Sequence, residues 1–208
     1  MNRKLVSKSN LVLRKVLNKE EHIDILKDMI EGILDIKIES IRLNPYLKSK
    51  EKYLPKEENF GVADVRIITK EKESLNVGIQ FIDGFYIQNK LLLYYAQIHT
   101  NQLEQQENQE IAKTITINIL DFEYFDTQKF HKIIKIKDKP NEGGVEETIE
   151  LHVIELPKWT CSLTKPITKE QAWVAYLAGI ETESILKFEK IKKLDNLLKQ
   201  YWEQEKIE

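Results

Sequence analysis

Asp64 and Gln80 are the polar residues whose types and positions could support chemistry. In the segment VADVRIITK every second residue from Ala63 is apolar, and this alternation predicts a strand that carries Asp64 on its polar face. The segment LNVGIQFI alternates in the same way and carries Gly78 and Gln80 on its polar face. Because only the short turn TKEKES separates them, we expect adjacent antiparallel strands. A carboxylate and a carboxamide then lie on one side of a sheet, beside a residue without a side chain.

The segments around these strands predict an α/β fold. Apolar residues recur at helical spacing over about 19–35, and Asn18 followed three residues later by Glu21 has the form of a capping box. The segment QNKLLLYYAQIHTNQLEQQ predicts a long helix over about 88–106, and the Ile-rich TITINIL predicts a buried central strand. Strand, long helix and strand form a right-handed crossover, so we expect a mixed sheet.

The remaining segments add further strands and helices. The β-rich run IKIESIRLNPYL precedes a charged loop, KSKEKYLPKEENFG, which we expect to be exposed, and HKIIKIKDKPNEGGVEETIELHVIEL predicts a hairpin. A helix over about 168–178 that ends at Gly179 and an amphipathic helix from about 182 follow. We expect a domain over 1–160, with a helical extension over 161–208 packed on it.

Length and composition limit the class of protein. With 208 residues, 41% hydrophobic and 32% charged, the chain has the composition of an ordinary globular protein. The net charge of −2 gives no reason to expect tight, non-specific binding to nucleic acid. A single cysteine, Cys161, cannot form an internal disulfide, so we expect a reducing, cytoplasmic environment. No segment approaches the apolar length of a membrane span, so we expect no membrane partner.

The order of these segments resembles that of the PD-(D/E)XK nucleases, and the local sequence resembles their recombination-promoting nuclease (Rpn) and putative transposase branch. The resemblance covers most of residues 11–158, through LVLRKVLNKEEHIDILKDMIEGIL, ADVRI, NVGIQ, LLYYAQIHTNQL, TITINILDF and IELHVIELPK. It implies a restriction-endonuclease-like fold with helices after the sheet. It also implies hydrolysis of DNA phosphodiesters with Mg²⁺, or with Mn²⁺ in its place. Mg²⁺ is usually held by one or two carboxylates together with phosphate and water.

The family motif maps onto four positions of this sequence. Asp64 stands at the strand aspartate that holds the metal, and Gln80 stands at the last position of the Glu-x-Gln signature, which positions the attacking water. Gly78 stands at the glutamate position, so the second acidic metal ligand is missing. Lys90 matches a basic position that could contact a DNA phosphate, although a salt bridge or an ordinary surface lysine is an equal alternative. We therefore expect slow or absent cleavage of DNA, and we expect Gly78→Glu to raise the rate.

Glu21 is the first candidate for a replacement metal ligand, because the family often brings an acid from the first helix toward the metal. It shares one helical face with Asp24 and Asp28. The alternative is that Glu21 only completes the capping box and that this face meets solvent. Asp64 also has a structural alternative, in which its carboxylate pairs with a nearby base such as Arg66.

Two non-enzymatic hypotheses stay open beside the impaired nuclease. The chain could keep the nuclease fold as a regulator that binds DNA or a protein partner, or it could be a remnant of a mobile element. A homodimer formed through the amphipathic helix of about 182–203 or through exposed aromatic side chains is a further expectation, and a helix packed in the core of a monomer fits the same pattern.

Other residues with chemical potential have plainer interpretations. The histidines lie in separate elements and lack the spacing of a zinc motif, so we interpret them as ordinary surface or partly buried residues; they are His22, His99, His131 and His152. Tyr94 and Tyr95 are expected to pack against the sheet rather than to stack on bases.

Overall fold

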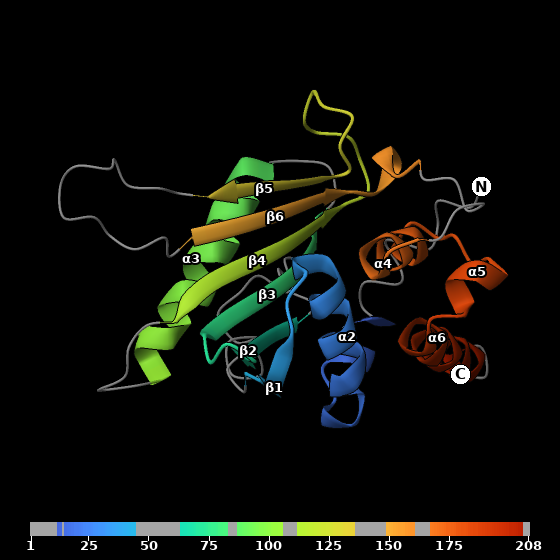
Figure 1. Cartoon of the computed structure of the whole chain (residues 1–208), viewed down its shortest axis with the longest axis horizontal. Helices are drawn as coiled ribbons and strands as arrows, with labels where there is room; N and C mark the ends of the chain where they lie inside the picture. Colours follow the sequence, from blue (N-terminus) through green and yellow to red (C-terminus); the bar gives the residue numbers. More distant parts are fainter. Residues whose placement is uncertain are drawn as a thin grey trace.

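The computed structural model describes residues 12–13, 15–44, 63–82, 87–105, 112–135, 149–160 and 167–205. In this part of the chain, six strands form one sheet in the order β1-β2-β3-β4-β6-β5 (Figure 1). The strands are β1 (Ile38–Leu43), β2 (Ala63–Thr69), β3 (Ser74–Ile82), β4 (Lys113–Leu120), β5 (His131–Lys135) and β6 (Ile149–Glu155). The helices are η1 (Glu20–His22), α2 (Ile23–Leu34), α3 (Ile87–Gln105), η4 (Leu156–Lys158), α4 (Lys169–Leu177), α5 (Glu183–Leu186) and α6 (Glu189–Glu205).

The sheet is mixed, as the sequence predicts. β1, β2 and β3 pair antiparallel, whereas β4 runs parallel to both β3 and β6. The long helix α3 makes the crossover from β3 to β4, and β6 pairs antiparallel with the preceding β5, as the predicted hairpin requires. The turn of that hairpin, at 136–148, and the charged loop KSKEKYLPKEENFG lie outside the described residues.

Helices cover both faces of the sheet (Figure 1). α3 packs along β3 and β4 on one face. On the other face α2 packs against β1 and is itself covered by α4 and α6. The main core lies on this second face, where Val65, Val77 and Ile117 are fully buried against side chains of α2 and α4. Because side chains alternate along a strand, the polar residues between these core positions point toward α3.

The helix predicted over about 19–35 begins differently from the prediction. Its first turn is the 3-10 segment η1, with Lys19 at the N-cap, and no side-chain hydrogen bond caps this turn or the start of α2. The predicted capping box between Asn18 and Glu21 is therefore wrong. A 3-10 first turn closes its hydrogen bonds over three residues, as in His22 N to Lys19 O at 2.9 Å, and so does not need that cap.

The C-terminal helices follow the predicted pattern with one break. α4 ends before Gly179, whose φ of 82° lies in the left-handed region that glycine adopts without strain. The predicted single amphipathic helix is divided into α5 and α6, with Lys187 and Phe188 between them. Its apolar stripe still faces inward, since Ile185 and Ile191 are fully buried. None of the helices in the described ranges has the length and apolar character needed to cross a bilayer.

Candidate functional site

Asp64 and Gly78 face each other across the antiparallel pair of β2 and β3, where they are register partners. Asp64 is only 1% exposed. Both residues belong to the sheet face that α3 covers. The prediction that Asp64 and the family's glutamate position share one side of the sheet is thus confirmed, and the two positions are direct neighbours.

Tyr94 of α3 fills the space above Gly78. A β-carbon on residue 78 would lie 2.9 Å from the Tyr94 hydroxyl oxygen, 3.0 Å from Tyr94 Cε1 and 3.0 Å from Ile98 Cγ1. These separations are shorter than ordinary van der Waals contact, so a side chain at 78 requires α3 side chains to move. The Tyr94 hydroxyl donates to the carbonyl oxygen of Ile79 at 3.0 Å and also lies 3.3 Å from that of Ala63. Tyr94 is therefore buried and held, as packing predicts.

Asn44, the residue after β1, holds the Asp64 carboxylate on its other side. Its Nδ2 donates to Asp64 Oδ1 at 2.9 Å and to Asn76 Oδ1 at 2.8 Å. Asn76 in turn donates from Nδ2 to the carbonyl oxygen of Ile98 on α3 at 3.1 Å. A chain of amides thus joins the end of β1, the site strands and the helix above them.

The second carboxylate oxygen of Asp64 has a different environment. Oδ2 is buried and has no hydrogen-bond partner among the residues that the structure describes. Burial raises the pKa of Asp64 to about 7, and the hydrogen bond from Asn44 only partly opposes that rise. Near neutral pH a substantial fraction of this carboxyl group is therefore protonated, which lowers its capacity to bind a cation.

Gln80 lies on the same face and is 1% exposed. Its Nε2 donates to Asn118 Oδ1 on the neighbouring strand β4 at 2.5 Å. Asn118 is fixed by its own donor group, which contacts Thr116 Oγ1 at 3.0 Å and the carbonyl oxygen of His152 at 3.0 Å. The amide group expected to position water is thus already engaged within the sheet.

Arg66 does not pair with Asp64. Its Nε donates to Ser74 Oγ at 2.8 Å and its Nη1 donates to Gln102 Oε1 on α3 at 3.0 Å. The structural alternative of an Asp64–Arg66 ion pair is therefore wrong, and the amide of Asn44 takes the place expected for a base. Lys90 lies in the first turn of α3 and is partly exposed.

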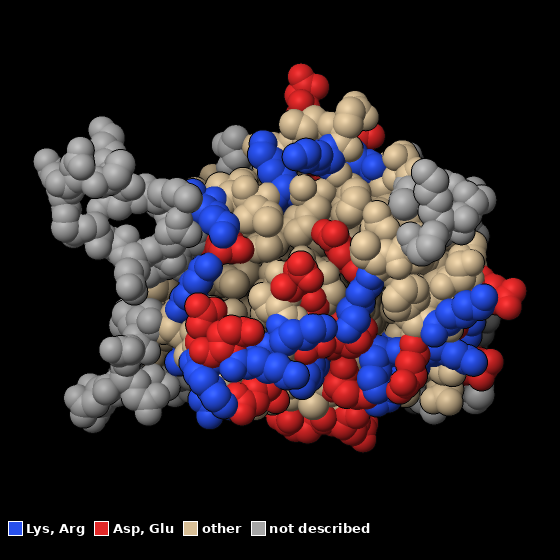
Figure 2. Space-filling model, in the orientation of Figure 1, with Lys and Arg blue, Asp and Glu red and all other residues tan. Residues whose placement is uncertain are grey.

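The acidic residues of the N-terminal helix lie away from this site. The side chain of Glu21 is 67% exposed and lies 3.6 Å from both Lys19 Nζ and His22 Nε2. Asp24 binds Lys193 Nζ of α6 at 2.8 Å, and Asp28 binds Lys169 Nζ of α4 at 2.7 Å. The alternative that this face meets solvent holds for Glu21, whereas Asp24 and Asp28 are only partly exposed and bind lysines of the C-terminal helices. Figure 2 shows basic and acidic side chains intermixed over this face.

The described residues around Asp64 do not fit a divalent metal. Mg²⁺ prefers oxygen ligands in octahedral geometry. Beside Asp64 stand an amide N–H from Asn44, a glycine, and the Tyr94 hydroxyl, which donates to a carbonyl that could otherwise serve as an oxygen ligand. Within the described ranges, no three His, Cys, Asp or Glu side chains are grouped so that they could hold a metal ion.

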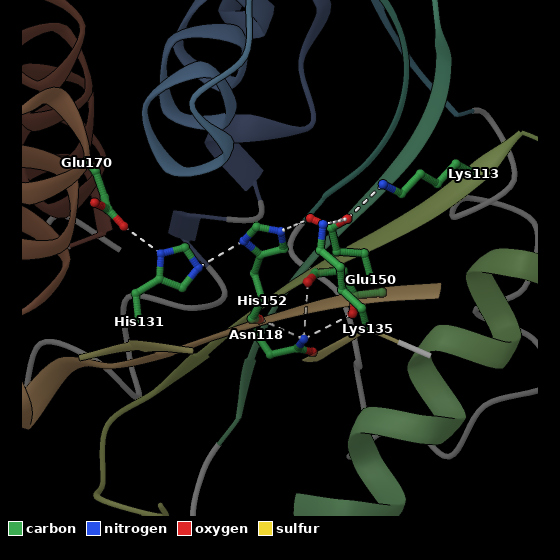
Figure 3. A network of polar contacts seen from close by, with 8 residues as sticks. Lys113, Asn118, His131, Lys135, Glu150, His152 and Glu170 are labelled. Atoms are coloured by element: carbon green, nitrogen blue, oxygen red, sulfur yellow. Dashed lines mark hydrogen bonds and ion pairs between the residues drawn. The ribbon is translucent and has the colours of Figure 1, made fainter. Parts of the chain in front are cut away.

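Two histidines from neighbouring strands lie in direct contact. The interpretation of the histidines as surface or partly buried residues is wrong for His152 and His22, which are 2% and 6% exposed, whereas His131 and His99 are partly buried as predicted. His131 on β5 and His152 on β6 are linked by Nε2 and Nδ1 at 2.9 Å, and a glutamate follows at each end of the pair (Figure 3). The β5–β6 pairing brings together two residues that stand 21 positions apart in sequence. Spacing along the chain carries no signal for such a pair.

A six-stranded mixed sheet with an aspartate on β2, a crossover helix above it and a glutamine on β3 defines a nuclease-type α/β fold. The family model for PD-(D/E)XK nuclease family transposases matches residues 8–207. The chain therefore belongs to this family, and the expected restriction-endonuclease-like fold is confirmed. The chain has no significant match among the curated proteins or among the solved structures.

Proposed function

We propose that this chain keeps the fold of Mg²⁺-dependent DNA endonucleases while its own hydrolysis of DNA phosphodiesters is impaired. The proposal rests first on chemistry. Metal-assisted cleavage needs carboxylates that hold the ion next to the scissile phosphate. In this chain the motif offers Asp64 alone, and burial disfavours its charged form.

The observation that carries the proposal is the position of Tyr94 above Gly78. Tyr94 and Ile98 approach the position that the β-carbon of a glutamate at residue 78 would occupy. The Tyr94 hydroxyl also engages the carbonyl of Ile79, beside the site. The side chains around residue 78 therefore support packing between α3 and β3 in place of metal binding.

Glu21 is not expected to replace the missing ligand. It lies in η1, next to the helix α2 that packs on the opposite sheet face, and its side chain points into solvent. A ligand from there would need the N-terminal helix to move around the sheet edge. We therefore assign Glu21 no metal role in this proposal.

The structure changes the mutational test of the proposal. The sequence alone suggests that Gly78→Glu restores cleavage, but the new side chain would collide with Tyr94 and Ile98. We expect the single variant to be destabilised and inactive. The informative variant is Gly78→Glu combined with Tyr94→Ala, which supplies both the carboxylate and the room for it.

Cleavage of supercoiled plasmid in Mg²⁺ and in Mn²⁺ tests the proposal. We expect no cutting by the unmodified protein. Any cutting gained by the double variant should disappear when Asp64→Ala is added, whereas adding Glu21→Gln should leave it unchanged. Robust cutting by the unmodified protein that Asp64→Ala abolishes would refute impairment.

A second candidate function is non-catalytic binding of DNA, with a protein partner as the alternative. It is favoured by the contrast between a well-packed sheet with helices on both faces and a motif that lacks its second acid. Lys90 would then contact phosphate. In a mobility-shift titration, Lys90→Ala should weaken binding and reduce the salt slope by about one. Lys192→Ala, an exposed lysine on α6, is the matched control. If no DNA is bound at low salt, size-exclusion chromatography tests for the proposed homodimer.

A further inference from the structure

A continuous chain of polar contacts links α4 to the edge of the sheet formed by β5 and β6 (Figure 3). Glu170 Oε1 on α4 lies 2.5 Å from His131 Nδ1 on β5. His131 Nε2 lies 2.9 Å from His152 Nδ1, and His152 Nε2 lies 2.7 Å from Glu150 Oε1, both on β6. The four side chains thus make three successive contacts, and His152 at the centre is 2% exposed.

The charges around this chain favour an ionised Glu150. Its Oε2 binds Lys113 Nζ of β4 at 2.7 Å and Lys135 Nζ of β5 at 3.1 Å. The hydrogen bond from His152 is the main cause that holds the pKa of Glu150 well below its usual range. The remaining nearby bases are engaged elsewhere, since Lys169 binds Asp28 and Lys158 binds Glu155.

The geometry sets the number of protons that the chain can hold. Each carboxylate accepts a hydrogen bond, so the facing nitrogens, His131 Nδ1 and His152 Nε2, must both carry a proton. The central contact joins two ring nitrogens and requires one proton, not two. Three protons on four nitrogens give one imidazolium and one neutral imidazole.

Any other number of protons on the four ring nitrogens breaks one of the three contacts. Removal of one proton leaves two lone pairs facing each other, either between the rings or against a carboxylate. Addition of one proton makes two N–H groups face each other at 2.9 Å. Burial is the main cause that lowers the pKa of His152, and a positive charge on His131 lowers it further, as expected of a pair that resists a second positive charge.

We propose that His131 and His152 share a single positive charge between Glu150 and Glu170, and that this chain is a pH-responsive attachment of α4 to the β5–β6 edge. Glu170 lies in the first turn of α4, between Thr168 and Gln171, the two residues that form its capping box. The attachment therefore acts on the N-terminal end of α4. The same end contacts α2, because Lys169 binds Asp28. This proposal does not rest on nuclease activity, although Asn118 connects His152 to the motif residue Gln80 by accepting from Gln80 and donating to the His152 carbonyl oxygen.

Nuclear magnetic resonance of the histidine rings in the full chain tests the proposal. Between two titration midpoints, the ¹⁵N shifts should show three protonated nitrogens on the His131–His152 pair. Both rings should report both midpoints, separated by more than about one pH unit because the sites are coupled. The backbone amides of 169–173 should follow the same midpoints. His99, which contacts Thr114 Oγ1 and stacks on Tyr95, serves as the internal reference.

Two substitutions distinguish coupled titration of the histidine pair from independent titration of each ring. In His131→Gln, His152 should titrate in a single step. In Glu170→Gln, the upper midpoint should move to lower pH by about 1–3 pH units, because an adjacent carboxylate no longer favours the charged pair. Glu183→Gln, which removes an exposed acid from the first turn of α5, should leave both midpoints in place.

Three results would overturn the proposal. Independent single-step titration of the two rings would show that they share no proton. Two or four protonated nitrogens between the midpoints would contradict the proton count. A shared proton with no response from the α4 amides would show that the chain does not control the attachment.

Discussion

Tyr94 stands over Gly78, with its hydroxyl oxygen 2.9 Å from the point that a β-carbon on residue 78 would occupy. The two residues belong to different elements, α3 and β3, and the contact is possible only because one of them has no side chain. The loss of the motif glutamate and the packing of the crossover helix are therefore one structural feature. A carboxylate cannot return to position 78 unless the helix side chains change too.

The first prediction concerns the coupling between these two residues. Gly78→Ala should lower the free energy of unfolding by about 1–3 kcal/mol, because the added methyl group overpacks a filled site. In a Tyr94→Ala background the same substitution should cost less, since the methyl group then enters the cavity left by the ring. Urea unfolding of the four proteins gives the coupling energy, which we expect to be about 0.5–3 kcal/mol.

Gly32→Ala provides the matched control for this double-mutant cycle. A β-carbon at Gly32 would meet Lys169 Cγ at 2.9 Å, so it is also crowded, but by α4 rather than by α3. Gly32→Ala should lower the free energy of unfolding by the same amount with Tyr94 and in the Tyr94→Ala background. Equal costs of Gly78→Ala in the two backgrounds would refute the contact with Tyr94.

The second prediction concerns the pH dependence of stability that Asp64 imposes. Its pKa is about 7 in the folded protein and 3.8 by reference, so the folded state holds the proton over that interval. Its contribution to stability is therefore lost as pH rises from about 4 through 7. The loss is at most about 4 kcal/mol, because each pKa unit corresponds to about 1.4 kcal/mol. Asp64→Asn should remove this dependence of the free energy of unfolding on pH.

Urea unfolding at pH 5 and at pH 8 measures the effect as a difference between the two proteins, so that other titrating groups cancel. Asp126→Asn, a change at an exposed aspartate, should leave the slope intact. A slope that survives Asp64→Asn would mean that the carboxyl group is ionised in the folded protein.

The third prediction concerns Asn44. Its amide is the group that stabilises the charged form of Asp64, through the 2.9 Å hydrogen bond to Oδ1. Asn44→Ala should therefore raise the pKa of Asp64 above its value in the unmodified protein. The carboxyl ¹³C shift of Asp64 followed through a pH titration reports this directly. An unchanged or lowered midpoint would contradict the assigned role of the amide.

Strand alternation was sufficient to predict the fold around the site. The alternating segments 63–69 and 75–82 predict two antiparallel strands with Asp64 and Gly78 on one face, and the register confirms this arrangement. Period and turn length determine which face a side chain takes, so local sequence carries that information. The crossover helix and the end of α4 at Gly179 were predictable for similar local reasons.

The partners of the site residues were not predictable from local sequence. Asn44 reaches Asp64 across 20 residues, and Asn118 reaches Gln80 across 38. The rings of His131 and His152 meet only because β5 and β6 pair. Such contacts depend on tertiary placement, for which a single sequence has no periodic signal. The absence of the motif glutamate was visible, whereas its consequence, a space filled by Tyr94, was not.

Mn²⁺ binding is the measurement that tests most directly whether the Asp64 site has lost its metal. Titration of Mn²⁺ into the unmodified protein, followed by the electron paramagnetic resonance signal of the free ion, should match titration into Asp64→Asn at pH 8. We expect equal, weak binding, because one buried carboxylate beside an amide donor and a filled glycine position offers no ligand set. Mn²⁺ binding that is clearly tighter in the unmodified protein and lost in Asp64→Asn would contradict the impaired site.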